Sequence, residues 1–255
     1  MPVPSDSFLE WFIGFFEGDG SFSIAKRSDL QFVVTESTSN VIVFNHILNT
    51  LGFGKVIVQS TASKTHRYVV QDLKNLSLLC LLFNGNLVLP IRKAKFDLFL
   101  TALNLRLVKL NSPSVTILEK WVLPTLEDSW LLGFSDAEGC FSCSLLTNSN
   151  AYRFRFILSQ KWSANKPVLS HIGKLFSYSK FTLTLHSTGE DNWELRFSSL
   201  ANCKGLFVYF DKFPLNSSKR KSYLLWKQLY SRLLNKDHLN SDLRAELVIL
   251  SRKIN

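Results

Sequence analysis

One twelve-residue pattern occurs twice in this chain, and the repetition limits the possible folds more than any other feature. WFIGFFEGDGSF runs from Trp11 to Phe22, and WLLGFSDAEGCF runs from Trp130 to Phe141. The two stretches align without a gap at an offset of 119 residues, and each places two acids among small residues after an apolar block. Self-similarity of this kind predicts a duplicated structural unit.

The similarity continues downstream at a slightly larger offset. The matches at 124 residues are Phe32–Glu36 with Phe156–Gln160, Pro90 with Pro214, and Lys95 with Lys219. The increase of five residues falls in Leu146–Ala151, a polar LTNSNA that is typical of a longer hairpin loop. Constant offsets on both sides of one loop insertion indicate two copies of a unit of about 110 residues.

Each copy is predicted to have the element order α-β-β-α-β-β-α. Ser7 and Glu10 have the spacing of a capping box at the start of a helix, and SFSIAKR and RFRFILSQK alternate as strands do, with Phe22 and Ile24 on one face of the first. The expected ranges are helices 7–18, 40–51, 74–84 and 91–108 with a second hairpin at 54–72, then helices 127–137, 164–176, 199–211 and 217–234 with a second hairpin at 179–197, and a last amphipathic helix at 240–253.

The fold class is therefore α+β, with pseudo-twofold duplicated units whose antiparallel sheets carry helices on one face. The predicted domains are 1–110 for the first repeat, 111–124 for a linker with prolines near both ends, and 125–255 for the second repeat with its extra C-terminal helix.

Composition narrows the class of protein. The chain has 255 residues, 46% of them hydrophobic, which is enough to bury the core of one large domain or two small ones. A formal charge of +10 favours a polyanionic partner, either nucleic acid or an anionic membrane surface. The longest apolar run, Leu76–Phe83, is far shorter than the roughly 20 residues that span a bilayer. A membrane-spanning segment is not expected.

The cysteines give little support to a metal site. Cys140 and Cys143 form a C-x-x-C pair, and no second pair completes a zinc site. On a strand, positions three apart face opposite sides. These two cysteines, with Cys80 and Cys203, are expected to be ordinary buried thiols.

The open face of each predicted sheet holds the candidate contacts to nucleic acid. Its positions are mostly Ser, Thr, Gln, Lys, Arg and His, side chains that read base edges in the major groove or contact phosphates. A solvated face is the ordinary alternative, but four hairpins with the same bias favour DNA. The candidates are Ser21, Ser23, Arg27, Thr35, Lys55, Gln59, Lys64, His66, Tyr68, Ser142, Ser144, Arg153, Arg155, Ser159, Lys161, Lys180, Thr182, Thr184 and Arg196.

Small residues recur in both copies of the motif, where they let another backbone approach closely. They are Gly14, Gly18 and Gly20 in the first copy and Gly133, Ala137 and Gly139 in the second. The two helices are therefore expected to pack against each other at a pseudo-twofold axis. Asp19 and Glu138 share the last helical position, so this packing would bring both carboxylates near the axis. Glu17 and Asp136, two positions earlier, are interpreted as capping or packing residues.

Asp19 and Glu138 are the strongest catalytic candidates. Two carboxylates at close range resist joint ionisation unless a cation neutralises them. Hard oxygen ligands, with waters and substrate phosphates, suit Mg²⁺, and a divalent ion beside a scissile phosphate can polarise it and activate water. A solvated acid at a helix end is the alternative, but an acid at the same place in both copies favours catalysis.

The motifs FIGFFEGDG and LLGFSDAEG resemble the nine-residue motif of LAGLIDADG homing endonucleases of the single-chain, two-motif type. The resemblance covers nearly the whole chain, because GNLVLPIRKAKF and FPLNSSKRKSY also resemble the family's sheet-to-helix segment. It implies a saddle-shaped, intron-encoded protein that cuts both strands of a long asymmetric site across the minor groove, leaves staggered ends, and so promotes intron homing.

Carried over by position, the resemblance makes Asp19 and Glu138 metal-binding acids, with the main-chain carbonyls of Gly18 and Ala137 as further ligands. It places Lys95 and Lys219 at the family's basic positions near the active site, which support the water network or stabilise developing charge.

Gln160 matches a polar residue that orients active-site water in the family. Its counterpart in the first copy is Glu36, where the family often has Gln, and both positions count as catalytic candidates. This difference, with Asp19 opposite Glu138, predicts half-sites that differ chemically and strands that are cut in sequence.

The resemblance also implies the cofactor, the partners and the compartment. Mg²⁺ is the expected metal, Mn²⁺ is expected to replace it, and Ca²⁺ is expected to bind without supporting cleavage. The expected partner is double-stranded DNA bound by a monomer, with host intron RNA as a further candidate and no membrane. Family membership suggests an organellar protein, with a mitochondrial location expected.

Three alternatives stay open. An intron RNA maturase would use the same scaffold, although the presence of both acids and both lysines favours nuclease chemistry. A regulator that binds specific DNA without cutting would have lost catalysis on the same fold. A small-molecule or acyl-transfer enzyme is disfavoured, because the sequence has no glycine-rich phosphate loop, no metal-type His pair and no convincing nucleophile motif.

Overall fold

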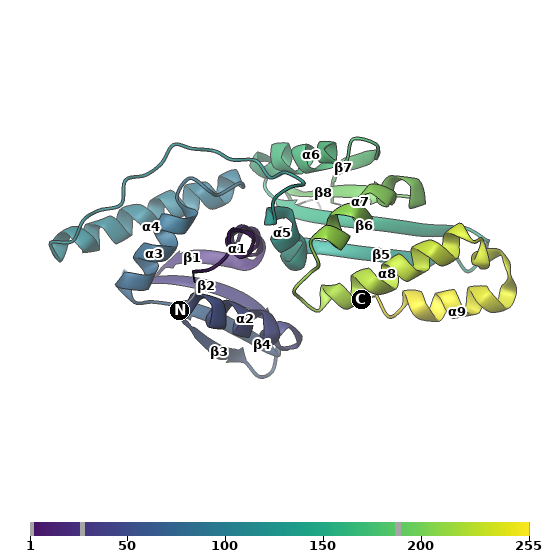
Figure 1. Cartoon of the computed structure of the whole chain (residues 1–255), viewed down its shortest axis with the longest axis horizontal. Helices are drawn as coiled ribbons and strands as arrows, with labels where there is room; N and C mark the ends of the chain where they lie inside the picture. Colours follow the sequence, from purple (N-terminus) through teal and green to yellow (C-terminus); the bar gives the residue numbers. More distant parts are fainter. Residues whose placement is uncertain (1–2, 26–28, 187–189, 255) are drawn as a thin grey trace. The chain divides into compact units, whose positions relative to one another are not determined.

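The computed structural model describes residues 3–25, 29–186 and 190–254. It divides the chain into two compact units, residues 1–137 and 138–255. Each unit contains a four-stranded antiparallel sheet with helices packed on it (Figure 1). The predicted α+β class, built from duplicated units, is confirmed.

The first unit follows the predicted element order. Its sheet has the strand order β1-β2-β4-β3. Its elements are α1 (Asp6–Asp19), β1 (Gly20–Ile24), β2 (Leu30–Ser37), a 3-10 turn (Thr38–Asn40), α2 (Val41–Leu51), β3 (Lys55–Ser60), β4 (Thr65–Val70), α3 (Leu73–Phe83), α4 (Pro90–Lys109) and most of α5 (Trp130–Glu138).

Aromatic side chains form the core between this sheet and its helices. The Phe16 ring lies 4.6 Å from the Phe32 ring and 4.6 Å from the Phe83 ring, measured between centroids. Phe22 and Phe32 pair across β1 and β2 on the same face and are buried. The predicted partner of Phe22 on that face, Ile24, is instead exposed, because it is the last residue of β1.

The second unit repeats this arrangement and then extends it. Its sheet has the order β5-β6-β8-β7, the counterpart of the first sheet (Figure 1). Its elements are β5 (Gly139–Leu145), β6 (Tyr152–Lys161), a 3-10 turn (Ser163–Asn165), α6 (Lys166–Leu175), β7 (Phe181–Leu185), β8 (Asn192–Ser198), α7 (Leu200–Lys212), α8 (Lys219–Leu234), a 3-10 turn (Asp237–Leu239) and α9 (Ser241–Ser251).

Trp226 of α8 is the centre of the second core. Its ring stacks on Phe154 at 4.3 Å between centroids and lies 5.2 Å from Phe141. Its Nε1 donates a hydrogen bond to the Ser142 carbonyl of β5 at 3.2 Å. The indole N–H therefore finds an acceptor although the side chain is fully buried, as a buried tryptophan requires.

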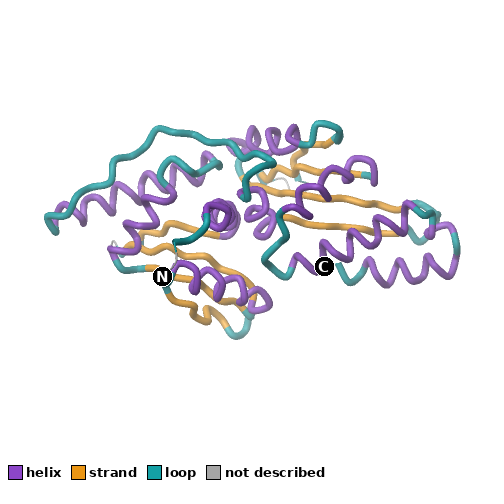
Figure 2. Tube along the Cα trace, viewed as in Figure 1, coloured by secondary structure: helices purple, strands orange, loops and turns teal. Residues whose placement is uncertain are grey.

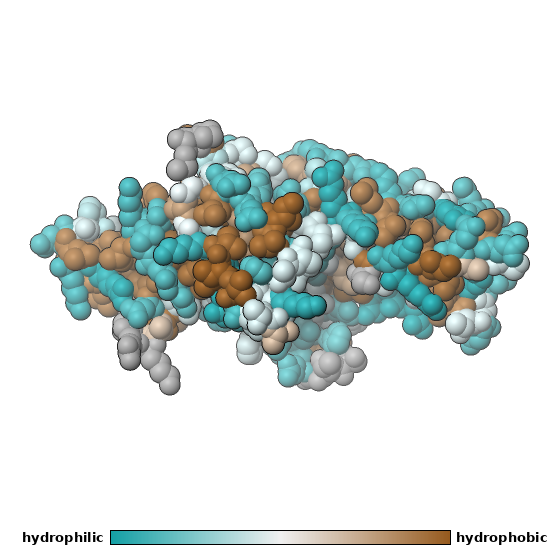
Figure 3. All heavy atoms as spheres, turned by 90° about the horizontal axis from the view of Figure 1, so that it is seen from below, coloured by the Kyte–Doolittle hydropathy of each residue, from teal (hydrophilic) through white to brown (hydrophobic). Residues whose placement is uncertain are grey.

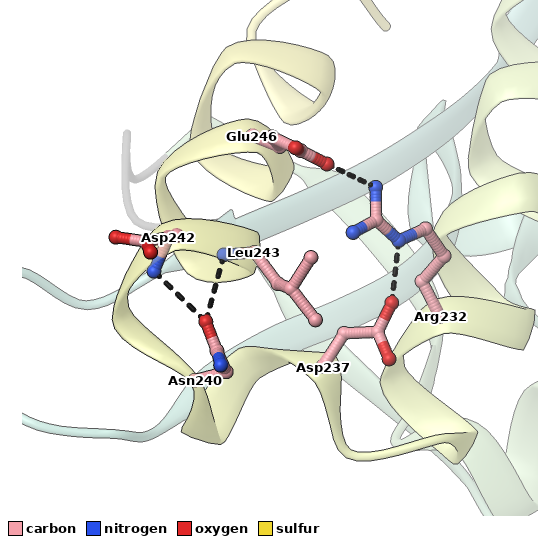
Figure 4. A network of polar contacts seen from close by, with 6 residues as sticks. All are labelled: Arg232, Asp237, Asn240, Asp242, Leu243 and Glu246. Carbon is pink, nitrogen blue, oxygen red and sulfur yellow. Dashed lines mark hydrogen bonds and ion pairs between the residues drawn. The ribbon is translucent and has the colours of Figure 1, made fainter.

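The C-terminal extension is held by charged and capping contacts. Arg232 of α8 donates to Asp237 through Nε at 2.5 Å and to Glu246 through Nη1 at 2.9 Å (Figure 4). The Asn240 side chain accepts from the backbone N–H groups of Asp242 and Leu243, which caps the start of α9. These contacts fix α9 against α8.

Arg244 of α9 holds the hairpin loop that the sequence marked as an insertion. Its guanidinium donates to the main-chain carbonyls of Leu146 at 2.6 Å and Ser149 at 2.7 Å, with longer bonds to Asn150 and Ala151. The extra loop of the second copy is therefore supported by the extra helix of the second copy.

We expect Arg244→Ala to loosen this loop without unfolding the unit, because it removes several hydrogen bonds to one exposed turn and leaves the core intact. Amide hydrogen exchange should show faster exchange in residues 146–151, with the buried strand positions of β6 unchanged. Arg252→Ala, at an exposed position just beyond the same helix, is the matched control. Equal exchange in the loop of both variants would contradict this role for Arg244.

The segment between α4 and α5, residues 110–129, contains neither helix nor strand and runs as a long loop (Figure 2). It is tied to the first unit through side-chain amides. Asn84 donates to the Thr116 carbonyl at 2.7 Å and accepts from the Leu118 N–H at 2.9 Å, and Asn104 makes the same pair of bonds with Val115 at 2.8 Å each. Two asparagines thus pin its central part.

Among the described residues, none of the helices is long and apolar enough to cross a membrane. On the face drawn in Figure 3, exposed hydrophobic side chains lie among hydrophilic ones.

Candidate endonuclease site

Two glycines bring the helices of the repeated motif into backbone contact. A Cβ atom built on Gly14 of α1 would lie 2.0 Å from the Trp130 carbonyl oxygen. A Cβ atom built on Gly133 of α5 would lie 1.9 Å from the Trp11 carbonyl oxygen. The contact is reciprocal, since each glycine faces the tryptophan of the other copy. The prediction that the two helices pack through their small residues is confirmed.

The same helices exchange a second pair of contacts. Trp11 Nε1 donates to Asp136 Oδ2 at 2.9 Å, and Trp130 Nε1 donates to Glu17 Oε2 at 2.7 Å. Both acids are fully buried. The predicted packing role of Glu17 and Asp136 is confirmed, and the structure adds their partners, which the sequence alone did not indicate.

We expect Trp11→Phe and Trp130→Phe each to lower the free energy of unfolding by about 1–3 kcal/mol, because each leaves a buried carboxylate short of one donor. Urea unfolding measures this loss. Trp121→Phe is the matched control, since Trp121 donates a bond of similar length to the Val88 carbonyl from a half-exposed position. A loss no larger than that of Trp121→Phe would contradict the importance of the buried bonds.

Glu17 also anchors the start of α4. Its carboxylate accepts the Val88 N–H at 3.0 Å and the Leu89 N–H at 2.7 Å, immediately before that helix begins. Burial raises the pKa of Glu17 to about 7, while the hydrogen bonds from Leu89, Val88 and Trp130 act in the opposite direction. Glu17, an acid of the repeated motif, therefore stabilises the packing of α1 against the start of α4.

Asp19 ends α1 and is half-buried. The main chain on both sides of it is bound by Arg92 of α4, which donates to the carbonyls of Glu17 at 2.7 Å, Gly18 at 2.6 Å and Gly20 at 2.6 Å. Arg92 was not among the site residues predicted from the sequence. The available signal was its place in the family-like segment GNLVLPIRKAKF, three residues before Lys95.

Glu138 ends α5 and is also half-buried. Its Oε1 accepts a hydrogen bond from Gln160 Nε2 at 2.9 Å. Glu36, the counterpart of Gln160, binds differently, because its Oε2 accepts from the Ser37 N–H at 3.1 Å and from Asn40 Nδ2 at 3.0 Å. The structure therefore brings Gln160 to the candidate acid and uses Glu36 to hold the turn before α2.

The two candidate lysines lie at the starts of matching helices. Lys95 is exposed in the second turn of α4, and Lys219 is half-buried as the first residue of α8. Their catalytic role stays a prediction.

The open face of the first sheet carries only part of the predicted set. Ser21, Ser23, Thr35, Lys55, Gln59 and Lys64 are exposed or half-exposed, whereas Arg27 lies outside the described residues. The predictions that Tyr68 and His66 lie on the open face were wrong. Tyr68 is fully buried, with its hydroxyl donating to the Phe53 carbonyl at 2.7 Å, and burial raises its pKa.

His66 alternates with Tyr68 along β4 and so belongs to the helix-covered side, where its Nδ1 lies 3.1 Å from Thr38 Oγ1. Strand alternation explains both corrections, because the register pairs Arg67 with Thr35 and Tyr68 with Val34. Arg67 is the outward basic residue that the sequence reasoning missed. Its Nε is buried and has no hydrogen-bond acceptor among the described residues. Arg67 and Lys55 line one groove of about 430 Å³.

The open face of the second sheet has the predicted orientation throughout. The outward strand residues are Ser142, Ser144, Arg153, Arg155, Ser159, Lys161, Thr182, Thr184 and Arg196, and Lys180 is exposed just before β7. Burial and the neighbouring charges of Arg196 and Arg153 lower the pKa of Arg155. One acid was not anticipated on this face. This acid is Glu194, which lies opposite Ser159 in the strand register. It is buried and forms an ion pair with Arg196.

The acids at the ends of α1 and α5 are each of the chemical type that binds a hard divalent cation. Asp19 and Glu138 supply carboxylate oxygens, the ligands that Mg²⁺ and Ca²⁺ prefer. The Gly18 carbonyl fits less well, because it already accepts a hydrogen bond from the cationic Arg92. Cys140 and Cys143 do not form a soft-metal site together, because they face opposite sides of β5. Cys143 is buried on the core side, and Cys140 lies on the other side.

The chain matches known proteins over most of its length. The family model described as LAGLIDADG endonuclease matches twice, at residues 12–103 and 131–230. A probable intron-encoded endonuclease 4 of Neurospora crassa is 35% identical over 97% of this chain. A probable intron-encoded endonuclease, Cox1-I1b, of Schizosaccharomyces pombe is 28% identical over 91% of it. The chain spans 44% of the first relative and 65% of the second.

Solved structures show the same fold at lower identity. The meganuclease I-SmaMI bound to uncleaveable DNA superposes with a TM-score of 0.84 at 15% identity, covering 98% of this chain and 99% of the other. The LAGLIDADG meganuclease I-AabMI bound to uncleaved DNA gives a TM-score of 0.79 at 21% identity, covering 97% and 99%. With two family-model matches across most of its residues, the chain belongs to the LAGLIDADG endonuclease family.

Proposed function

We propose that this protein is a site-specific DNA endonuclease that makes a staggered double-strand break by divalent-metal-assisted hydrolysis and so promotes homing of its intron. The observation that carries the proposal is the duplicated motif, in which each family-model match begins on a helix that ends in a half-buried acid, Asp19 or Glu138. Two matched acids correspond to two strands to be cut.

Double-stranded DNA is the proposed partner. The net charge of +10 favours a polyanion, and each sheet presents outward Ser, Thr, Lys and Arg side chains that can contact phosphates and base edges. The outward Arg155 and Arg196, and Arg67 in the first unit, are the strongest candidates for guanine or phosphate. Several related structures contain DNA. Binding should weaken steeply with salt.

Asp19 and Glu138 are proposed to hold the metal, with the Ala137 carbonyl as a further oxygen ligand. The bound cation would polarise the scissile phosphate and lower the pKa of a bound water. Gln160 fixes the orientation of Glu138 through its side-chain amide. Lys95 and Lys219 are proposed to stabilise developing negative charge. Mg²⁺ is the proposed physiological ion, with Mn²⁺ as a substitute and Ca²⁺ as a non-productive one; one structural relative was studied with calcium.

The decisive experiment is incubation of the protein with a randomised duplex library and Mg²⁺, followed by sequencing of the cut ends. We expect one enriched site with a constant stagger, loss of cutting in EDTA, recovery with Mn²⁺, and binding without cutting in Ca²⁺. Tight binding to one site without cutting in Mg²⁺ or Mn²⁺ would contradict the nuclease and support a DNA-binding regulator.

A mitochondrial origin is proposed from the relatives, two of which are named for fungal cox1 introns. Stimulated splicing of the host intron by a variant without both acids would indicate a maturase on the same scaffold.

A further inference from the structure

Arg92 binds the main chain at the end of α1. Three of its guanidinium nitrogens donate to three main-chain carbonyls, those of Glu17, Gly18 and Gly20, at 2.6–2.7 Å. These residues flank Asp19 on both sides. The last carbonyls of a helix have no N–H partners within the helix, and α1 has no basic residue in its own last turn. Arg92 supplies both the donors and the positive charge from α4.

The contact is locked from the other direction as well. Glu17, from the last turn of α1, accepts the N–H groups of Val88 and Leu89 at the start of α4. The Glu17 side chain therefore fixes the start of α4, and the Arg92 side chain fixes the end of α1. A planar guanidinium suits this task, because its N–H groups point in fixed directions.

The second unit has no arginine at the matching position. At the offset of 124 residues that relates Pro90 to Pro214, Arg92 corresponds to Asn216, which is exposed before α8 begins. An asparagine carries no charge and has a single NH₂ group to donate. In the second unit the candidate acid, Glu138, accepts a hydrogen bond from the Gln160 side chain.

We infer that Arg92 is a positioning residue of the first half-site: it fixes the backbone around Asp19, and its charge opposes a divalent cation at the Gly18 carbonyl. Both effects follow from the same three bonds. Because a carbonyl that accepts from a guanidinium at 2.6 Å would hold two cations side by side, we expect the Gly18 carbonyl to be a poor ligand for a divalent cation.

Three variants separate geometry from charge. Arg92→Gln removes the positive charge and the planar set of guanidinium N–H donors. Arg92→Lys keeps the charge but replaces these donors by one ammonium group. Lys109→Gln, which removes an exposed charge from the last turn of the same helix, is the matched control. Two readouts are needed: calorimetric titration of the free protein with CaCl₂, and separate cutting rates of the two strands of a duplex labelled on each strand, both at a temperature where every variant is folded.

With Arg92→Gln we expect Ca²⁺ to bind about 3–10-fold more tightly, because a neighbouring positive charge is gone, and one strand to be cut about 10–100-fold more slowly than the other, because Asp19 is misplaced. Arg92→Lys should keep the wild-type Ca²⁺ affinity and recover only part of the lost rate. Lys109→Gln should match the wild type in both measurements.

Unchanged Ca²⁺ affinity together with equal slowing of both strands would overturn the inference, since a purely structural loss would act on both. So would wild-type behaviour of Arg92→Gln in both readouts. The effect on cutting rests on the proposed nuclease function, but the Ca²⁺ titration does not. If the wild-type protein binds Ca²⁺ and cuts no duplex, the nuclease proposal fails while the affinity comparison still decides the role of Arg92. A wild-type protein that neither binds Ca²⁺ nor cuts overturns both.

Discussion

Asp19→Asn should reduce double-strand cutting by about a thousandfold or more while leaving DNA affinity within a few-fold of the wild type. The substitution keeps the size of the side chain at the end of α1 and removes the anionic oxygen proposed to bind the cation. Electrostatic stabilisation of this kind is commonly the largest single contribution to catalysis, with a loss of about 10²–10³-fold for one donor. Removing a metal ligand weakens both the stabilisation of negative charge by the cation and the activation of the attacking water.

The measurement is a supercoiled-plasmid assay in Mg²⁺, with DNA affinity measured in Ca²⁺ by fluorescence anisotropy. Asp6→Asn is the matched control, since Asp6 is exposed in the first turn of the same helix, where losing a carboxylate costs about 0.3–1 kcal/mol of helix stability and should not alter cutting. Glu138→Gln should behave as Asp19→Asn does. Double-strand cutting by Asp19→Asn at the wild-type rate would remove this acid from the proposed mechanism.

Gly14→Ala should destabilise the protein by about 3 kcal/mol or more, the upper part of the range for overpacked sites. Replacing glycine by alanine inside a helix normally gains about 1 kcal/mol. Here the added Cβ would lie 2.0 Å from the Trp130 carbonyl oxygen and 2.9 Å from the Phe134 nitrogen. Both are backbone atoms of α5, so the clash cannot be relieved by a side-chain rotation and outweighs the gain in propensity.

Urea unfolding measures the change, and Gly133→Ala should give a similar loss because the contact is reciprocal. Gly205→Ala is the matched control in α7: the nearest atoms to its added Cβ are Ser179 Oγ at 3.5 Å and Phe176 Cδ1 at 3.7 Å, which is ordinary contact. That variant should be neutral or slightly stabilised. Equal stability of Gly14→Ala and Gly205→Ala would show that the helices do not need this close approach.

Repetition made much of the fold predictable. Constant offsets located both copies of each helix and strand, and the small residues that recur in each motif, Gly14 and Gly133 among them, predicted the helix contact. Alternation predicted the outward positions of β6, because a regular strand has a period of two residues. It failed at Tyr68 and His66, which were assigned without a register for β4, and a shift of one residue exchanges the two faces.

The two candidate acids were predictable because both copies agree at their position. Asp19 and Glu138 stand at one position of a repeated pattern, so the sequence marks them twice. Arg92 has no equivalent arginine in the second copy, and its partners are main-chain carbonyls, which every residue possesses. Glu36 shows the converse, because its position matches Gln160 while its hydrogen bonds go to Ser37 and Asn40.

The sequence by itself determined that this chain is a duplicated α+β protein with one acid at the end of each motif helix. Periodicity and repetition are properties of the order of residues along the chain, so they are visible without a structure. Only the tertiary structure decided that Glu17 and Asp136 pair with the tryptophans of the opposite helices, and that Arg92 binds the backbone around Asp19. Those contacts join residues about 70 to 125 positions apart, and their geometry depends on how helices already formed pack against each other.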